Sequence, residues 1–268
     1  MAPLMETLRA NLKGRQAYKA HAEGNRLLDA EKYDLAKRKH DQALALYDEA
    51  AALGCVNSGV RMAYSLLLMR YGRLDEAKEV MLGLQGRADL TPADKKQLRI
   101  NYAVCLWKMG DLDRAIALMK EAGSAGMTGT IYSTLGLFLL QKAERTGDYT
   151  EAADFCAKAL DYDDEDADAL DNMGALHMGL SAVAAQAGDA ARAAEERRTA
   201  IDYYDKALAV RPRLITALYA RAKLHHEDGA DEQARELLDR TEGMPIGMLC
   251  PVTRAQIEQL RREADGAS

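Results

Sequence analysis

The sequence predicts an all-α protein built from helical hairpins that repeat along the chain. The first observation is the segment Gly110–Ala115, where two stretches with apolar residues three and four positions apart meet at a glycine followed by an aspartate. Such spacing is typical of helices that bury one stripe, and glycine can end a helix in the left-handed conformation. Asp111 can accept hydrogen bonds from the free amides that open the second helix. The segment therefore predicts a hairpin with a very short turn.

The second observation is that this signature recurs. The closing alanines of the first four copies are spaced roughly 40 residues apart, and the interval before the last copy leaves room for two repeats. The copies are Glu31–Ala36, which lacks the glycine, Gly72–Ala77, Gly110–Ala115, Gly147–Ala152 and the weaker Gly229–Ala234. Helical hairpins that recur at this period indicate an α-solenoid, in which each repeat packs only on its neighbours.

The third observation is the composition. The 268 residues include only five prolines, and the aromatic fraction is 6%, so the core must rely on Leu, Ala and Met. The net charge of −6 argues against nucleic acid as the main partner, because phosphate binding needs a basic stripe. No apolar run is long enough for a signal peptide or a membrane span. The four cysteines lack metal-ligand spacing and are interpreted as reduced thiols of a cytoplasmic protein.

The predicted helices follow the chain in pairs. A lead-in helix over residues 1–16 carries Leu4, Leu8 and Leu12 at helical spacing. Gly54 closes one helix, while Asn57 and Thr91, which precedes Pro92, are expected N-caps. The six pairs are Tyr18–Ala30 with Tyr33–Leu53, Ser58–Tyr71 with Leu74–Leu84, a third helix ending at Met109 with Leu112–Ala122, Gly129–Thr146 with Tyr149–Leu160, Asp166–Ala187 with Ala190–Val210, and Leu214–Glu227 with Asp231–Arg240.

A break at Gly243–Gly247 ends the pattern. The polar segment Thr253–Ala264 then predicts a terminal helix, because a solenoid needs a cap over its last apolar face. The sequence thus predicts three parts: the lead-in helix over 1–16, a repeat array over 17–242, and a linker with a capping helix over 243–268.

The hairpins resemble tetratricopeptide repeats, whose unit is two helices in about 34 residues. Small residues carry the resemblance, because they let paired helices approach closely. In first helices they are Gly24, Gly136 and Gly174; in second helices they are Ala36, Ala77, Ala115, Ala152, Ala200 and Ala234. Ile201–Pro212 is the best single match, and the resemblance covers about residues 17–241. It implies a right-handed superhelix of six hairpins, although repeats one, four and five depart from the usual length.

The resemblance also implies that the first helix of each pair lines a concave groove that binds a protein or peptide segment. Asn side chains there can hold the backbone of an extended peptide, and Trp107 can anchor an apolar side chain or simply pack between helices. Asn101 and Trp107 are expected to bury little on folding. The residues placed in the groove are His21, Asn25, Met62, Leu66, Met69, Arg70, Gln97, Asn101, Trp107, Lys108, Asn172, Tyr219, Lys223 and His226.

The sequence shows no enzyme signature, so we expect no catalytic residue, metal or cofactor. The five histidines lack metalloprotease spacing, and the acidic turn Asp161–Asp171 lacks the glycine of a calcium loop, so it predicts a solvated turn or a docking patch for a basic partner. Gly24 and Asn25 resemble one corner of the family's carboxylate clamp, but His21 and Ala63 replace its Lys and second Asn.

The sequence therefore predicts a non-catalytic scaffold or adaptor with a protein or peptide partner and no membrane association. One alternative is a helical-repeat RNA-binding protein, which Lys37–Lys39 and the basic amino-terminal segment favour. Another is a structural protein that self-associates, for example as a homodimer.

Overall fold

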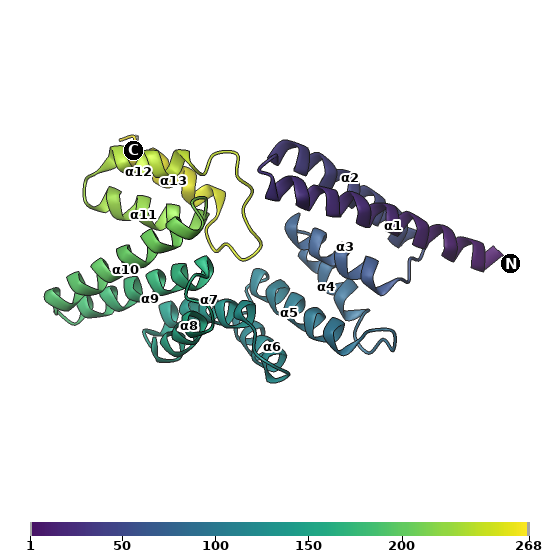
Figure 1. Ribbon diagram of the computed structural model, residues 1–268, viewed down its shortest axis with the longest axis horizontal. Helices are drawn as coiled ribbons and strands as arrows, with labels where there is room; N and C mark the ends of the chain where they lie inside the picture. Colours follow the sequence, from purple (N-terminus) through teal and green to yellow (C-terminus); the bar gives the residue numbers. More distant parts are fainter. Residues whose placement is uncertain (1, 267–268) are drawn as a thin grey trace. The chain divides into compact units, whose positions relative to one another are not determined.

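The computed structural model describes residues 2–266, with side chains from residue 5, and every regular element in this range is an α-helix. The helices divide into two compact units, one ending at Leu118 and the other beginning at Met119 (Figure 1). The boundary falls inside helix α6 (Leu112–Ser124). The predicted all-α, solenoid-type fold class is confirmed.

The helices follow the predicted pairs closely. The first unit contains α1 (Ala2–Asp29), α2 (Tyr33–Ala52), α3 (Ser58–Arg70), α4 (Leu74–Leu82), α5 (Pro92–Lys108) and the start of α6. The second contains the rest of α6, α7 (Gly129–Thr146), α8 (Thr150–Tyr162), α9 (Ala167–Gln186), α10 (Ala190–Val210), α11 (Ile215–Glu227), α12 (Asp231–Asp239) and α13 (Arg254–Ala264).

The amino-terminal boundary differs from the prediction. We expected a separate lead-in helix before the first repeat, but α1 runs without a break through residues 2–29. No proline or capping residue interrupts the apolar periodicity between the two predicted segments, so the helix continues. Its buried residues Ala10 and Ala17 lie on the side that faces the rest of the unit.

Every copy of the repeated turn has a residue in the left-handed conformation where the first helix ends. At Gly110, φ is +86°, and the amide of Asp111 donates to the carbonyl of Leu106 at 2.9 Å. This bond belongs to the motif that ends helices at a left-handed residue. In the copy that lacks glycine, Glu31 takes the left-handed conformation with φ of +57°, and Lys32 donates to Leu27. A residue with a Cβ atom disfavours this conformation, so Glu31 keeps the turn geometry of the repeat despite its own backbone preference.

Helix starts agree with the expected capping residues. The side chain of Asn57 accepts from the amide of Val60 at 2.9 Å. Thr91 forms a reciprocal capping box with Asp94, with Pro92 at the first helical position. These side chains satisfy amides that have no partner within the helix.

The small residues of the predicted signature lie where paired helices touch. The alanines are buried, with exposed fractions of 0–1%: Ala36, Ala77, Ala115, Ala152, Ala200 and Ala234. A Cβ atom added at Gly24 would lie 2.4 Å from the His40 ring, and one at Gly174 would lie 2.5 Å from the Tyr204 ring. The close helix approach on which the resemblance rests is therefore present.

The carboxyl-terminal helix packs against the last hairpin of the second unit. Helix α13 contacts both α11 and α12, and its apolar residues Ile257, Leu260 and Ala264 are 2–4% exposed. A second capping box, between Thr253 and Gln256, opens this helix.

Candidate functional site

The first helices of the hairpins adjoin one another in the first unit, where α3 packs against both α1 and α5. The predicted groove residues of this unit fall into two groups. Asn25, Arg70 and Gln97 are exposed, and Met62, Leu66, Trp107 and Lys108 are half-buried. His21, Met69 and Asn101 are buried, with exposed fractions of 7%, 2% and 5%. The expectation that Asn101 buries little is wrong, because almost every residue of α5 from Leu98 to Leu106 is enclosed.

Asn101 has an incomplete set of hydrogen bonds. Its Oδ1 accepts from Nε2 of the exposed Gln97 at 2.9 Å, one helical turn away. Its Nδ2 is buried and donates to no acceptor among the described residues. A buried donor without a partner costs about 1–3 kcal/mol relative to a paired one. The stripe formed by Gln97 and Asn101 therefore contains one buried amide donor without a partner among the described residues.

A polar cluster joins α1, α2 and α3. Nε2 of His40 lies 3.0 Å from Oδ1 of Asn25, and Nδ1 of His40 lies 3.4 Å from Nη1 of Arg70. Since Arg70 can only donate and the Asn25 oxygen can only accept, these partners assign the neutral imidazole with its proton on Nε2. Burial, together with the charge of Arg70, lowers the pKa of His40 to about 4. Burial also lowers the pKa of His21, whose ring lies 5.5 Å from that of His40, to about 4.

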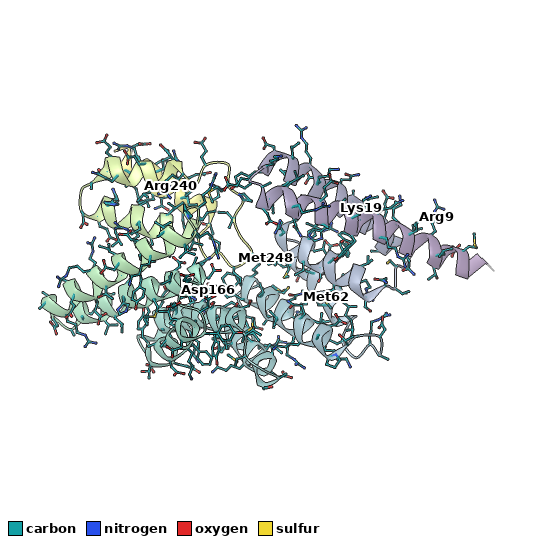
Figure 2. The ribbon with its side chains drawn as sticks, viewed as in Figure 1. Arg9, Lys19, Met62, Asp166, Arg240 and Met248 are labelled. Atoms are coloured by element: carbon teal, nitrogen blue, oxygen red, sulfur yellow. The ribbon has the colours of Figure 1, made fainter. Side chains whose placement is uncertain are left out.

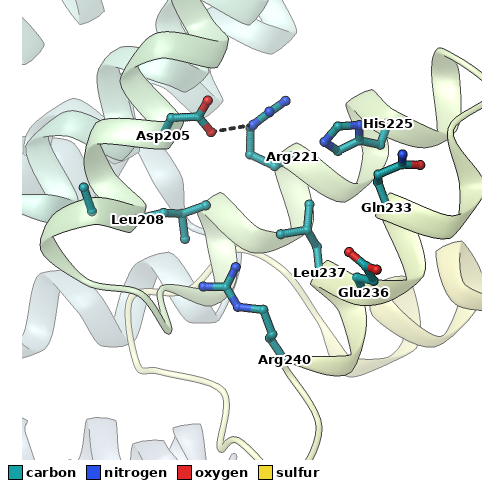
Figure 3. Close-up of a pocket in the computed structure, with 9 residues that line it drawn as sticks. Asp205, Leu208, Arg221, His225, Gln233, Glu236, Leu237 and Arg240 are labelled. Carbon is teal, nitrogen blue, oxygen red and sulfur yellow. Dashed lines mark hydrogen bonds and ion pairs between the residues drawn. The ribbon is translucent and has the colours of Figure 1, made fainter.

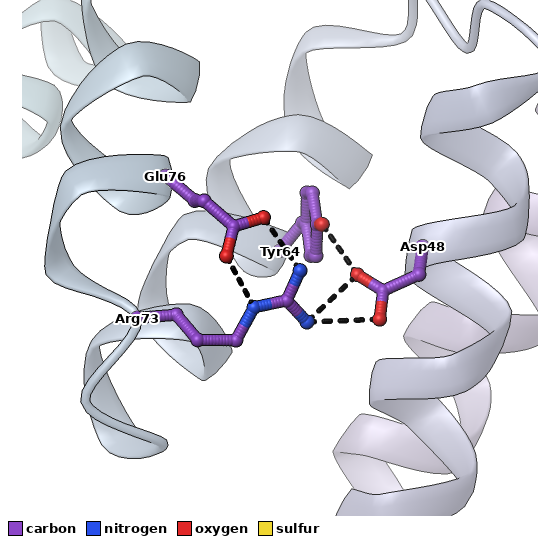
Figure 4. Close-up of polar contacts among 4 residues, drawn as sticks. All are labelled: Asp48, Tyr64, Arg73 and Glu76. Carbon is purple, nitrogen blue, oxygen red and sulfur yellow. Dashed lines mark hydrogen bonds and ion pairs between the residues drawn. The ribbon is translucent and has the colours of Figure 1, made fainter.

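A second polar network fixes α2, α3 and α4 relative to one another (Figure 4). Arg73 donates from Nη1 to both carboxylate oxygens of Asp48, at 2.8 and 3.0 Å, and from Nε and Nη2 to Glu76 at 2.6 Å. The hydroxyl of Tyr64 donates to Asp48 at 2.5 Å. The Arg73 hydrogen bond lowers the pKa of Glu76. Because one guanidinium binds two carboxylates, its geometry specifies the hairpin arrangement more than a lone surface ion pair does.

The predicted groove residues of the second unit have mostly structural partners. Asn172 is 5% exposed, and its Nδ2 donates to the carbonyl of Ser133 at 2.7 Å, joining α9 to α7. His226 pairs with Asp231 at 2.6 Å across the α11–α12 turn. Tyr219 is half-buried, and Lys223 is exposed, 3.9 Å from Glu227. Asn172 therefore makes the bond between helices that Asn101 lacks.

The acidic turn serves mainly to join α8 to α9. Oδ1 of Asp166 accepts from the amides of Asp168 and Ala169, so this residue caps α9. Asp168 forms a bidentate ion pair with Arg211 at 2.8 and 3.1 Å. Asp166 and Asp168 thus lie at the amino terminus of α9, where carboxylates stabilise the free amides.

Asp171, at the end of this acidic segment, has an unusual environment. Among the described residues, neither its Oδ1 nor Oγ1 of Thr216 has a hydrogen-bond partner, although both atoms are buried. Burial raises the pKa of Asp171 to about 7, and the charge of Asp168 adds to this, while the charge of Arg211 acts in the opposite direction. Near neutral pH this carboxyl group is therefore partly protonated in the folded protein.

We expect Asp171→Asn to stabilise the second unit at pH 8. The folded-state pKa lies above the unfolded value, so the wild-type protein loses stability as the pH rises towards 7 and the folded carboxyl ionises. The variant should gain on the order of 1–3 kcal/mol at pH 8 and less at pH 5.5. Hydrogen exchange of α9 amides at the two pH values measures this, with the exposed Asp164→Asn as the control. Equal effects of the two variants would contradict the prediction.

A surface pocket in the second unit was not predicted from the sequence (Figure 3). It has a volume of about 420 Å³ and is lined from three helices, by Asp205, Leu208 and Ala209 of α10, Arg221 and His225 of α11, and Gln233, Glu236, Leu237 and Arg240 of α12 or its end. Nε of Arg221 donates to Asp205 at 2.7 Å. No motif marks this pocket, because its lining comes from three helices whose side chains meet only after folding.

The structure offers no metal centre in the part it describes: no three His, Cys, Asp or Glu side chains cluster there as ligands. All four cysteines are free, and burial raises the pKa of Cys105 to about 11 and of Cys156 to about 12. Among the described helices, none combines the length and apolarity of a transmembrane span.

Comparison with known proteins adds evidence on the fold. No protein-family profile and no curated protein sequence matches the chain. Among solved structures, the human IFIT1 dimer with PPP-AAAA superposes with a TM-score of 0.56 over 76% of this chain at 14% identity. A monomeric IFIT1 mutant with Gppp-AAAA gives the same TM-score at 15% identity. In both cases the match spans only 46% of the IFIT1 chain.

A likeness is also found to YrrB, described as a TPR protein with an unusual peptide-binding site, at a TM-score of 0.43 and 20% identity over 75% of this chain and 90% of that one. At these identities the likeness concerns the fold alone. The paired helices, the left-handed turns and the small residues between helices provide the independent evidence. Together with the IFIT1 superposition, they show that the chain folds as an α-solenoid of helical hairpins, the fold that the resemblance to tetratricopeptide repeats implies.

Proposed function

We propose that this chain is a non-catalytic scaffold or adaptor that binds an extended protein or peptide segment on the face formed by α1, α3 and α5 of the first unit. The observation that carries the proposal is the buried Nδ2 of Asn101, which has no acceptor among the described residues. The backbone carbonyl of a bound segment would supply that acceptor once the side chains that enclose the amide move aside on binding.

Several neighbouring features support a peptide over a small ligand. Gln97 holds Oδ1 of Asn101, so the orientation of the amide is already fixed before binding. On α3, Met62 and Leu66 leave part of their side chains in solvent, and on α5 the ammonium of Lys108 lies 5.5 Å from the Trp107 ring centre. An elongated face with apolar positions and one oriented amide matches the alternation of side chains and carbonyls in an extended chain.

The test begins with selection of ligands from a displayed peptide library against the full chain. Affinity for a selected peptide is then measured for the wild type and for Asn101→Asp, which replaces the donor by an acceptor of the same shape. We expect a loss of about tenfold or more. Glu79→Ala, exposed on α4, should bind as the wild type does. An unchanged affinity of Asn101→Asp, with an unchanged melting temperature, would remove the proposed site.

RNA binding is a second candidate, because the structures of IFIT1 were solved with PPP-AAAA and Gppp-AAAA. The basic cluster that favoured it is partly neutralised: Lys37 pairs with Asp41 at 2.9 Å and Lys39 with Glu23 at 3.0 Å. Titration with a 5′-triphosphate adenosine tetranucleotide at two salt concentrations distinguishes the two candidates. Tight binding that weakens steeply with salt would favour RNA.

A further inference from the structure

The first turns of α1 carry an exposed apolar stripe that the rest of the unit does not cover. Met5, Leu8 and Leu12 are 66%, 64% and 57% exposed. They lie at spacings of three and four residues, so they share one face of the helix. The opposite face carries Ala10 and Gly14: Ala10 is fully buried, and a Cβ atom added at Gly14 would lie 2.7 Å from Val60. Only one side of this segment therefore packs against the rest of the unit.

Basic side chains lie on both sides of the stripe. At 100° per residue, Arg9 falls on one flank of the Met5–Leu12 row and Arg15 on the other, and Lys19 continues the line of the row towards the carboxyl end of the helix. All three are exposed, and among residues 5–266 none of them has an ion-pair or hydrogen-bond partner. Figure 2 shows Arg9 and Lys19 along α1, and Figure 1 shows the first turns of α1 extending past the end of α2. The segment thus presents an apolar row between unneutralised cations.

We infer that this stripe of α1 docks on an anionic lipid surface. A helix that lies in a bilayer interface places apolar side chains among the acyl chains and basic side chains at the phosphates. The stripe has this order, and long Arg and Lys side chains can reach the head groups while their stems follow the apolar row. The inference is independent of peptide binding by α3 and α5.

Charge argues against the other occupants. Packing α1 against α1 of a second copy would bring Arg9, Arg15 and Lys19 of both copies together, with only Glu6 nearby to offset them. A protein partner would need an apolar groove with carboxylates on both walls. A bilayer containing acidic lipids supplies both properties without a matched shape.

The test is co-sedimentation of the full chain with vesicles of phosphatidylcholine alone or with about 30% phosphatidylserine. We expect at least about tenfold stronger binding to the anionic vesicles and its loss at about 1 M salt. Leu8→Glu with Leu12→Glu should abolish binding, and Arg9→Glu with Arg15→Glu should weaken it about tenfold or more. Val210→Glu changes a side chain that is 49% exposed at the end of α10 and should bind normally.

Three outcomes would overturn the inference. One is equal sedimentation with neutral and anionic vesicles, or none with either. Another is a dimer by light scattering that the Leu8→Glu, Leu12→Glu variant converts to a monomer, since the stripe would then bind a second copy. The third is vesicle binding that the stripe variants leave intact. Because the substituted side chains are exposed, the variants should melt like the wild type, which a thermal scan checks.

Discussion

Lowering the pH from about 7.5 to about 4.5 is expected to destabilise the first unit by roughly 3–5 kcal/mol. The cause is the pair His21 and His40, each held by burial at a pKa of about 4, against 6.5 for an exposed imidazole. A folded-state pKa below the unfolded value means that the unfolded chain binds more protons between pH 6.5 and 4. Stability is therefore complete above pH 6.5 and falls as the pH approaches 4.

The geometry explains why protonation is costly. Two imidazolium rings would lie 5.5 Å apart, with the Arg70 guanidinium 3.4 Å from Nδ1 of His40. Nδ1 of the neutral ring accepts from Arg70, and protonation would turn this contact into two donors facing each other. Asp41 raises the pKa of His40 slightly, but burial and Arg70 dominate.

The measurement uses Trp107, the only tryptophan of the chain, which lies in the first unit. Denaturant unfolding followed by its fluorescence at several pH values gives the stability of this unit. The variant His21→Gln with His40→Gln should start less stable at pH 7.5 but show little dependence on pH down to 4.5. Resonances of His21 or His40 that titrate near pH 6.5 in the folded protein would contradict the assignment.

Helix positions could be predicted from the sequence because the turns mark them. A glycine, followed in several copies by an aspartate, marks the hairpin turns, and the repeat extends this inference to Glu31, where the structure has a left-handed turn without glycine. Where no such mark exists, the prediction fails, as in the supposed division between a lead-in helix and the first repeat. The periodicity of apolar residues cannot distinguish one long helix from two short ones in line.

The faces of the first helices were harder to predict. Asn101 was assigned to an open groove, but nearly every position of α5 from Leu98 to Leu106 is buried, so no alternation of polar and apolar residues identifies the exposed side there. Asn101 and Asn172 follow similar helical patterns, yet only Asn172 reaches a backbone carbonyl of the preceding first helix. That difference depends on the distance between neighbouring helices, which the sequence does not encode locally. The exposed stripe of α1 could not be predicted from the sequence, because its exposure depends on which residues the rest of the unit covers.

Gly174→Ala is expected to destabilise the second unit by about 2–4 kcal/mol, although alanine is the better helix former. The new Cβ atom would lie 2.5 and 2.6 Å from Cε1 and Cδ1 of Tyr204, well inside van der Waals contact. Tyr204 is 5% exposed and belongs to a core cluster with Leu170, Ala200 and Leu224, so its ring has no room to retreat. The helices α9 and α10 would have to separate.

The decisive comparison is the same substitution in a variant that lacks the Tyr204 ring. In Tyr204→Val the side chain ends before the ring atoms, and Gly174→Ala should there be neutral or stabilising by up to about 1 kcal/mol, because the helix interior gains alanine. The control in wild-type background is Gly129→Ala, whose Cβ would lie 3.2 Å from Tyr162, a side chain that is 57% exposed and free to move. Its effect should stay within about 0.5 kcal/mol. Thermal unfolding followed by circular dichroism gives the effect of each substitution on stability.

If Gly174→Ala destabilises the wild type but not the Tyr204→Val variant, the close approach of the two helices is the cause. If Gly174→Ala costs the same with and without the Tyr204 ring, the loss comes from the backbone of α9, and small residues are not required for this hairpin. If Gly174→Ala costs no stability once the Tyr204 ring is removed, the glycine is present because α9 and α10 meet there. The same helix has a second such contact at Gly179, where a Cβ atom would lie 2.2 Å from the Tyr149 ring. Gly179→Ala should therefore show the same dependence on Tyr149, now between α9 and the preceding hairpin.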